Sequence, residues 1–148
     1  MKNVRLTKHL KEMKQFGPVY TGGKFQILKG GKHGLALNEH KVTLFLVEGA
    51  KVLGTHAQEN EDIATFAISP NQKVFATSSK NGLIRTFRMP DLAENENDFQ
   101  QFEKMECSNT FRAQNQLILE MTFDPNSKFL ALGTTDSQIK IYDVVNGF

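Results

Sequence analysis

The feature that most constrains this chain is a unit of three short strands that occurs twice, 55 residues apart. The later copy contains three apolar runs separated by turn-forming residues, at 117–123, 129–132 and 139–144. The last run alternates apolar and polar residues with a period of two, which is typical of a strand. The stretch 63–89 aligns with the later copy without a gap, so that Pro70 falls on Pro125. A repeated antiparallel meander indicates a repeat architecture.

A third, weaker copy precedes these two. Its strand candidates are separated by polar turns and lie at 25–28, 35–37, 42–47 and 51–55. The sequence therefore predicts an all-β fold of about three four-stranded antiparallel units, the last of them incomplete. We expect these units at about 19–58, 59–111 and 112–148.

Two details complete the expected layout. Residues 90–98 begin with proline and are acidic, so we expect an exposed loop there, with an outer strand within 99–111. Apolar runs hold four phenylalanines that we expect to pack inside the blades, namely Phe75, Phe87, Phe123 and Phe129.

The turns and strand ends of these units resemble WD40 repeats. Ser69-Pro70-Asn71 and Asp124-Pro125-Asn126 match the turn after the first strand, and residues 131–136 resemble the next turn. Ile141-Tyr142-Asp143-Val144 stands where such a repeat has its Trp-Asp dipeptide. The resemblance implies a partial WD40-type β-propeller. Its structural repeat positions would be Pro70, Asn81, Phe87, Pro125, Asp136, Tyr142 and Asp143.

The chain also departs from the WD40 pattern. It has no tryptophan, and Glu59 and Gln114 stand where each blade should open with Gly-His. The buried His–Asp–Ser/Thr–Trp hydrogen-bond network of strong repeats therefore cannot form. We expect the blades to be held by packing and by strand ladders, while Asp136 braces its own turn.

A narrower resemblance covers nearly the whole chain. Residues 20–25, the approach to Ser69-Pro70, residues 121–127 and residues 141–145 are similar to the N-terminal blades of the transducin-beta-like WD40 subunit of the small-subunit processome. That resemblance implies a non-catalytic scaffold in the nucleolus of the nucleus, supporting U3-dependent pre-18S rRNA processing. Its partners would be other processome proteins and U3 snoRNA or pre-rRNA. The alternative is a generic WD40 adaptor that binds proteins or peptides in the cytoplasm, in signalling, translation initiation or ubiquitin ligation.

Charge is unevenly distributed along the chain. The formal net charge is only +2, but residues 1–32 hold eight basic side chains against one acidic, and residues 91–106 hold six acidic against one basic. Residues 1–18 form a basic arm that either contacts RNA phosphates or is simply a solvated terminus. The candidate RNA-binding residues are Lys2, Arg5, Lys8, Lys11, Lys14 and Lys24.

Other chemistry finds little support in the sequence. Gly17 to Lys24 misses the phosphate-loop spacing and lacks the following hydroxyl, the histidines lack zinc-site spacing, and no nucleophile elbow occurs. We therefore expect no catalytic residue, no metal, no cofactor and no small-molecule substrate. Cys107 is the only cysteine, which favours a reducing compartment, and no apolar run is long enough to span a membrane.

Length sets a last constraint. A seven-bladed ring of about 40-residue repeats needs about 300 residues, so 148 residues cannot close one. The sequence is either part of a longer protein or a natural short form. An open propeller exposes strand edges, so we expect the isolated chain to be poorly soluble or oligomeric.

Overall fold

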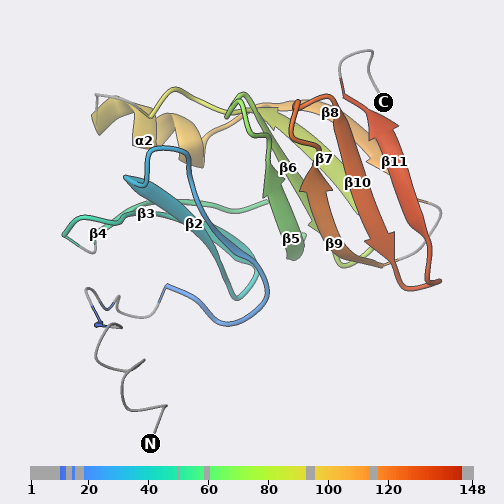
Figure 1. Ribbon diagram of the computed structural model, residues 1–148, viewed down its shortest axis with the longest axis horizontal. Helices are drawn as coiled ribbons and strands as arrows, with labels where there is room; N and C mark the ends of the chain where they lie inside the picture. The colour runs from blue at the N-terminus through green and yellow to red at the C-terminus, as the bar shows by residue number, and fades with distance from the viewer. Residues whose placement is uncertain are drawn as a thin grey trace, which may run out of the picture.

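The computed structural model describes residues 11–12, 15, 19–49, 51–58, 61–92, 96–113 and 117–144. Its strands form three antiparallel sheets that lie one after another, as blades do in a propeller, and the ring is not closed (Figure 1). The expected all-β, partial propeller fold is confirmed, with one helix inserted between two strands. The third sheet has three strands, so the expectation of an incomplete last blade is also confirmed.

Each sheet is a meander in which neighbouring strands follow one another in the chain. The first sheet contains β1 (Phe25–Ile27), β2 (His33–Asn38), β3 (Lys41–Leu46) and β4 (Lys51–His56). The second contains β5 (Ile63–Ile68), β6 (Val74–Ser79), β7 (Leu83–Arg88) and β8 (Cys107–Arg112). The third contains β9 (Ile118–Phe123), β10 (Phe129–Thr134) and β11 (Ile139–Asp143).

The 55-residue repeat holds down to the backbone of the turns. Gln72 and Ser127, which are 55 residues apart, both have φ of 58°, a left-handed conformation that non-glycine residues rarely adopt. The amide of Gln72 donates to Ser69 O (2.8 Å), and that of Ser127 donates to Asp124 O (3.0 Å). The second and third sheets are therefore copies of one local structure.

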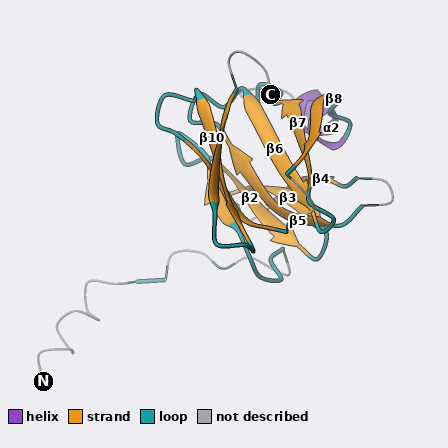
Figure 2. Cartoon of the chain, turned by 90° about the vertical axis from the view of Figure 1, so that its right-hand side faces the viewer, coloured by secondary structure: helices purple, strands orange, loops and turns teal. Residues whose placement is uncertain are grey.

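Helix α2 (Glu96–Glu103) was not expected from the sequence. It occupies residues 96–98, where we expected an exposed loop, and Phe99–Glu103, where we expected the start of an outer strand. The outer strand itself, β8, begins only at Cys107. The helix contacts β4 of the first sheet, and Figure 2 shows it in purple against the orange strands.

The helix is held by burial of an aromatic residue. Phe102 is fully buried in the core between the first two sheets, with Phe99 partly buried beside it. Gly54 on β4 allows the close approach, since an added Cβ would lie 3.2 Å from Phe99 O and 3.3 Å from Glu103 Cγ. Glu103 Oε1 also accepts a hydrogen bond from the Thr55 amide (3.2 Å). Local composition favours a loop here, and tertiary contact overrides it.

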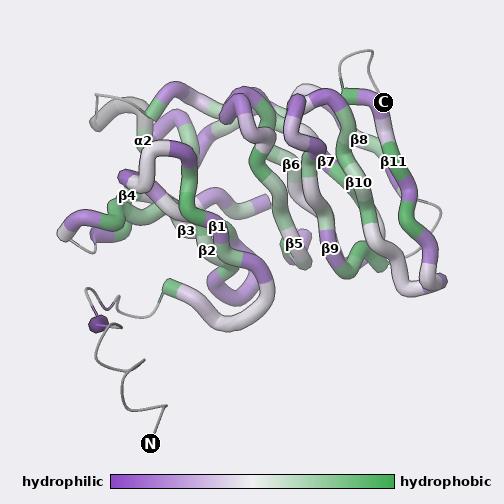
Figure 3. The backbone as a smooth tube through the Cα atoms, viewed as in Figure 1, coloured by the Kyte–Doolittle hydropathy of each residue, from purple (hydrophilic) through white to green (hydrophobic). Residues whose placement is uncertain are grey.

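Two apolar cores lie between the three sheets. Figure 3 shows the hydrophobic residues along β5 and β10. The first joins sheets one and two and includes Leu35, Leu44, Phe66, Phe75 and Phe87. The second joins sheets two and three and includes Ala76, Ile84, Met121, Leu130 and Leu132. The middle sheet therefore supplies both cores, one from each face.

The far face of the third sheet has no such partner among the described residues. Ile139 and Ile141 are 77% and 67% exposed, and Phe129 is 38% exposed. The expectation that Phe129 packs inside a blade is therefore wrong, whereas Phe75, Phe87 and Phe123 are buried as expected. In the middle sheet the position equivalent to Ile139 is Ile84, which is fully buried under the third sheet.

Candidate functional site

The turns after the first strands use side-chain oxygens to cap their own backbone. Asp124 accepts hydrogen bonds from the amides of Asn126 (3.1 Å), Lys128 (2.6 Å) and Phe129 (2.7 Å). The Phe129 amide is the largest cause that lowers the pKa of the Asp124 carboxyl, because these donors favour its ionised form. Pro70 and Pro125 lie exposed at the same position of the two turns.

In the equivalent turn of the middle sheet, the side chains of Ser69 and Asn71 together accept the amide hydrogen bonds that Asp124 accepts alone. The Ser69 hydroxyl donates to Asn71 Oδ1 (2.7 Å) and accepts from the Val74 amide (3.0 Å). Asn71 Oδ1 accepts from the Lys73 amide (3.0 Å). Ser127 then links the two blades, since its hydroxyl accepts from the Asn71 amide (2.9 Å).

The turns after the second strands are also equivalent. The Ser79 hydroxyl donates to Asn81 Oδ1, and the Thr134 hydroxyl donates to Asp136 Oδ1 at the position 55 residues later. Asn81 Oδ1 further accepts from the Leu83 amide (3.2 Å). These contacts give Asn81 and Asp136 the geometry of turn-bracing residues.

Aromatic residues occupy the tryptophan position of the third strands. Phe87 is buried and lies 4.8 Å, ring centroid to centroid, from His56 and 5.9 Å from Phe75. Tyr142 is half-buried and packs 4.7 Å from Phe111 of the preceding sheet. Asp143 follows Tyr142 at the end of β11 and pairs in register with Phe129.

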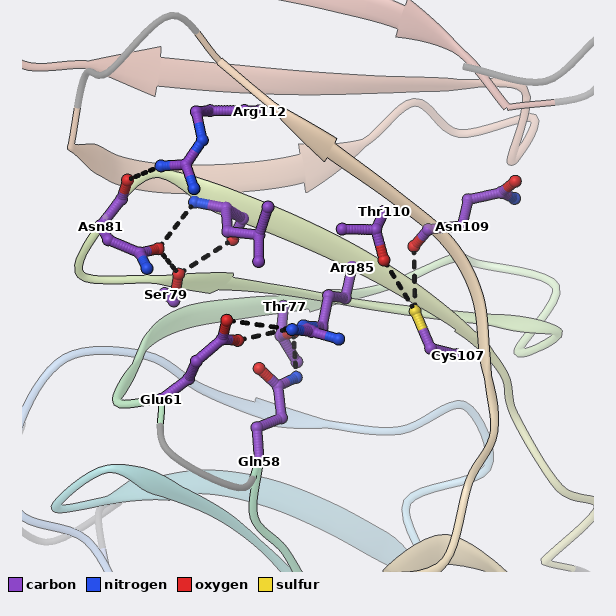
Figure 4. Close-up of polar contacts among 11 residues, drawn as sticks. Gln58, Glu61, Thr77, Ser79, Asn81, Arg85, Cys107, Asn109, Thr110 and Arg112 are labelled. Atoms are coloured by element: carbon purple, nitrogen blue, oxygen red, sulfur yellow. Dashed lines mark hydrogen bonds and ion pairs between the residues drawn. The ribbon is translucent and has the colours of Figure 1, made fainter.

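A polar cluster lies in the middle blade (Figure 4). Glu61 accepts two hydrogen bonds from Arg85, at 3.0 and 2.9 Å, and Gln58 Nε2 donates to Thr77 Oγ1 (2.5 Å). The hydrogen bond to Glu61 is the largest cause that raises the pKa of the Arg85 guanidinium. The expectation that packing and strand ladders hold the blades did not include this cluster. Glu59 and Gln114 lie outside the described residues.

His56 is a further buried polar residue that sequence reasoning missed. Its ring lies among Phe75, Phe87 and Phe102, at centroid distances of 5.5, 4.8 and 6.0 Å. Neither ring nitrogen has a hydrogen-bond partner among the described residues. Burial lowers the pKa of His56, and the backbone of Phe102 opposes that shift without reaching hydrogen-bond geometry. We therefore assign this imidazole its neutral form near neutral pH.

The candidate RNA-binding residues fall into two groups. Lys2, Arg5, Lys8 and Lys14 lie outside the described residues, and Lys11 is exposed. Lys24 is only 16% exposed, and its ammonium group contacts Glu120 Oε1 (3.0 Å) and the carbonyl of Met121, both on β9 of the third sheet. The same group lies 5.9 Å from the centroid of the Phe66 ring. This geometry favours a role for Lys24 in holding the three sheets together.

A basic hollow lies at the end of the blades that carries the β1–β2 and β5–β6 turns. It consists of two adjoining depressions of about 880 and 540 Å³ that share Lys73, Met89, Pro90 and Asp91. Its basic side chains are Lys29 and Lys32 from the β1–β2 turn, Lys73 from the β5–β6 turn, Arg88 at the end of β7 and Lys104 after α2. Its acidic side chains are Asp91 and Glu106. Together these residues form the basic hollow.

The described residues form neither a metal-binding cluster nor a membrane-spanning helix. They contain no group of three or more His, Cys, Asp or Glu side chains that could hold a metal ion. No helix within them is long and apolar enough to cross a membrane.

Comparisons with known proteins agree with the fold. Residues 105–143 match the family WD domain, G-beta repeat. The chain is 30% identical over 130 residues to transducin beta-like protein 3 of Bos taurus and 28% identical over 133 residues to that of Homo sapiens. These alignments cover 86% and 88% of this chain but only 15% of each relative, so the chain spans about one seventh of their length.

A solved structure gives the same picture of the architecture. The β-propeller domain of Myceliophteria thermophila Cps50 (Swd1) superposes with a TM-score of 0.66 at 14% identity, over 83% of this chain and 40% of that one. At that identity the likeness shows the fold alone. The chain thus carries a WD domain, G-beta repeat on a partial β-propeller, and it is similar over most of its length to part of transducin beta-like protein 3.

Proposed function

We propose that this chain acts as a non-catalytic WD40 scaffold in the small-subunit processome, supporting U3-dependent pre-18S rRNA processing in the nucleolus. The observation that carries the proposal is the similarity to transducin beta-like protein 3, which extends over 86% of the chain rather than over one blade. It agrees with the resemblance of residues 20–25 to the opening of the processome subunit's first blade, which is more specific than blade motifs shared by all WD40 proteins. Fold alone would not support a particle, because propellers serve many functions.

The arrangement of the molecule suits a scaffold. Its turns are fixed by short side-chain contacts at Asp124, Ser69 and Asn71, so the loop faces present rigid shapes to neighbours. Rigid, preformed surfaces lower the entropic cost of association. The processome proteins and the RNA that contact these surfaces are part of the proposal.

Co-purification tests this function. The native protein is tagged at its chromosomal locus and isolated under gentle salt, and U3 RNA is measured in the eluate against an unrelated small nuclear RNA. We expect selective enrichment of U3, accumulation of 18S precursors after depletion, and nucleolar staining. A cytoplasmic protein without U3 enrichment would contradict the proposal and support the adaptor alternative.

A further inference from the structure

We propose that the basic hollow binds the phosphate backbone of single-stranded RNA. It is formed by segments far apart in the sequence, namely the β1–β2 turn, the β5–β6 turn, the stretch after β7 and the end of α2. The fold therefore gathers cations that no run of the sequence displays together. Neither Lys24 nor any residue of 1–18 is among the described residues that line it.

Charge is the first argument. Five basic side chains line the hollow against two acidic ones, which gives it a formal charge of +3 in a chain whose total is +2. The five basic residues are exposed, and within the described part of the chain none of them forms an ion pair. By contrast, the ammonium of Lys24 and the guanidinium of Arg85 are engaged with carboxylates. Unpaired cations around a concave surface attract a polyanion.

The rest of the lining favours RNA over an acidic protein segment. Four side-chain amides contribute hydrogen-bond donors: Asn71, Gln72, Gln100 and Gln101. The apolar lining residues are buried, as for Leu28 and Met89, or half-buried, as for Pro90, Leu92 and Met105. None of them is among the large exposed hydrophobic residues of the described chain. Protein interfaces depend on large apolar anchors, whereas phosphate recognition needs cations and amide donors.

The shape of the hollow agrees with a flexible strand. The two adjoining depressions share Lys73. Arg88 and Lys104 line one of them, and Lys29 and Lys32 line the other, so cations occur along the whole hollow. Proteins that bind single strands without sequence preference use positively charged grooves that follow the backbone. The inference deepens the proposed function, because it names a surface through which the scaffold would contact RNA.

A pair of matched variants tests the proposal in the 148-residue chain. Lys73→Gln with Lys104→Gln removes two charges from the hollow. Lys41→Gln with Lys80→Gln removes two exposed charges from the opposite end of the blades. Lys41 begins β3, and Lys80 lies in the β6–β7 turn, 3.7 Å from Asp62 Oδ2. Both variants lower the net charge by two, so an effect of net charge alone would be the same in both. The probe is a fluorescent poly(U) RNA of about 20 nucleotides, and anisotropy gives the affinity at several salt concentrations.

Counterion release sets the expected size of the effect. Each lost phosphate contact lowers the slope of log affinity against log salt by about 0.7, so the Lys73/Lys104 variant should lose about 1.4. At ~0.1 M salt the corresponding loss of affinity is about 25-fold, and the Lys41/Lys80 variant should stay within about twofold of the parent chain. All four lysines are exposed, and thermal melts of both variants verify folding.

The other outcomes each overturn the inference. Equal loss in both variants would mean that only the net charge matters, and no loss in either would place RNA contact elsewhere. Absence of RNA binding by the parent chain would also refute it, and binding of poly-glutamate instead would indicate an acidic protein partner. Co-purification of the native protein with U3 is measured separately. Enriched U3 with an unaffected Lys73/Lys104 variant would leave the scaffold function standing without this surface.

Discussion

A glycine in β2 provides the sharpest test of the packing described here. Gly34 lies directly across from Phe45 in the β2–β3 ladder, and the buried Phe45 ring covers it. A Cβ at Gly34 would lie 2.3, 2.6 and 3.0 Å from three atoms of that ring. Non-bonded carbon atoms pack at about 3.5–4.0 Å, so in Gly34→Ala the Phe45 ring must move by roughly 1 Å or more.

The free-energy cost of Gly34→Ala follows from the tight packing around Gly34. Overpacking a well-filled site costs about 1–3 kcal/mol, while replacing glycine at an ordinary φ restricts the unfolded chain and stabilises by about 0.4–1 kcal/mol. We therefore expect Gly34→Ala to lower the free energy of unfolding by about 1–2 kcal/mol. For a chain of this size that corresponds to a Tm lower by roughly 2–8 °C.

Gly133 supplies the matched control. It lies in β10, the strand equivalent to β2, and the nearest atom to an added Cβ is Glu120 O at 3.9 Å, an ordinary contact. Gly133→Ala should therefore be neutral or stabilising by up to about 1 kcal/mol. Urea unfolding measures both variants, and Phe45→Leu completes a double-mutant cycle with Gly34→Ala. We expect a favourable coupling of about 1 kcal/mol or more, because the smaller side chain leaves room for the methyl group.

Two results would refute this reasoning. Gly34→Ala could prove as harmless as Gly133→Ala, which would mean that the ring moves aside at little cost. Alternatively, the effects of Gly34→Ala and Phe45→Leu could add without coupling, which would place the strain elsewhere.

Three further expectations concern the polar cluster, the buried histidine and the exposed sheet face. Glu61→Gln and Arg85→Gln should each lower the free energy of unfolding, and their cycle should show coupling of about 1 kcal/mol or more because the pair is bidentate and partly buried; additive losses would contradict this. The pKa of His56 is lowered in the folded state, so the unfolded chain binds more protons below about pH 6.5 and stability should fall as pH drops below that value. Urea midpoints at about pH 7.5 and 5.5 test this, and a His56→Leu variant with an unchanged pH dependence would exclude His56 as the cause. Ile139→Lys with Ile141→Lys should reduce self-association in light scattering without lowering stability by more than about 1 kcal/mol, whereas unchanged association would mean that another surface mediates it.

Local features of the fold could be predicted from the sequence. The turns at Ser69 and Asp124 depend on side chains that bond their own backbone within five residues, and such contacts leave a direct sequence signal. The strand positions could be predicted from the alternation of apolar and polar residues and from the 55-residue repeat. The turn positions of Asn81 and Asp136 could be predicted for the same reason. Each lies two residues after the hydroxyl that donates to it, on Ser79 and Thr134 respectively.

Contacts between distant elements could not be predicted in this way. Glu61 and Arg85 are 24 residues apart, and only the β5–β7 arrangement brings them together. Phe129 has the same pattern as a buried residue, and no periodicity reveals whether a neighbouring sheet covers its face. Helix α2 is acidic and polar along most of its length, so its sequence does not indicate a packed helix. Burial of Phe102 and the close approach to Gly54 of β4 become visible only in the folded structure.

The helix insertion also changes how the repeat itself should be understood. The first strands of the three sheets begin at residues 25, 63 and 118, so consecutive units start 38 and 55 residues apart. The connection between third and fourth strands covers residues 47–50 in the first unit and 89–106 in the second, where it contains α2. Most of the extra length therefore lies in one connection, outside the strand ladders. Evolution can lengthen or shorten a blade at this point without shifting any strand register, so the number of residues per blade is free to vary while its geometry stays fixed.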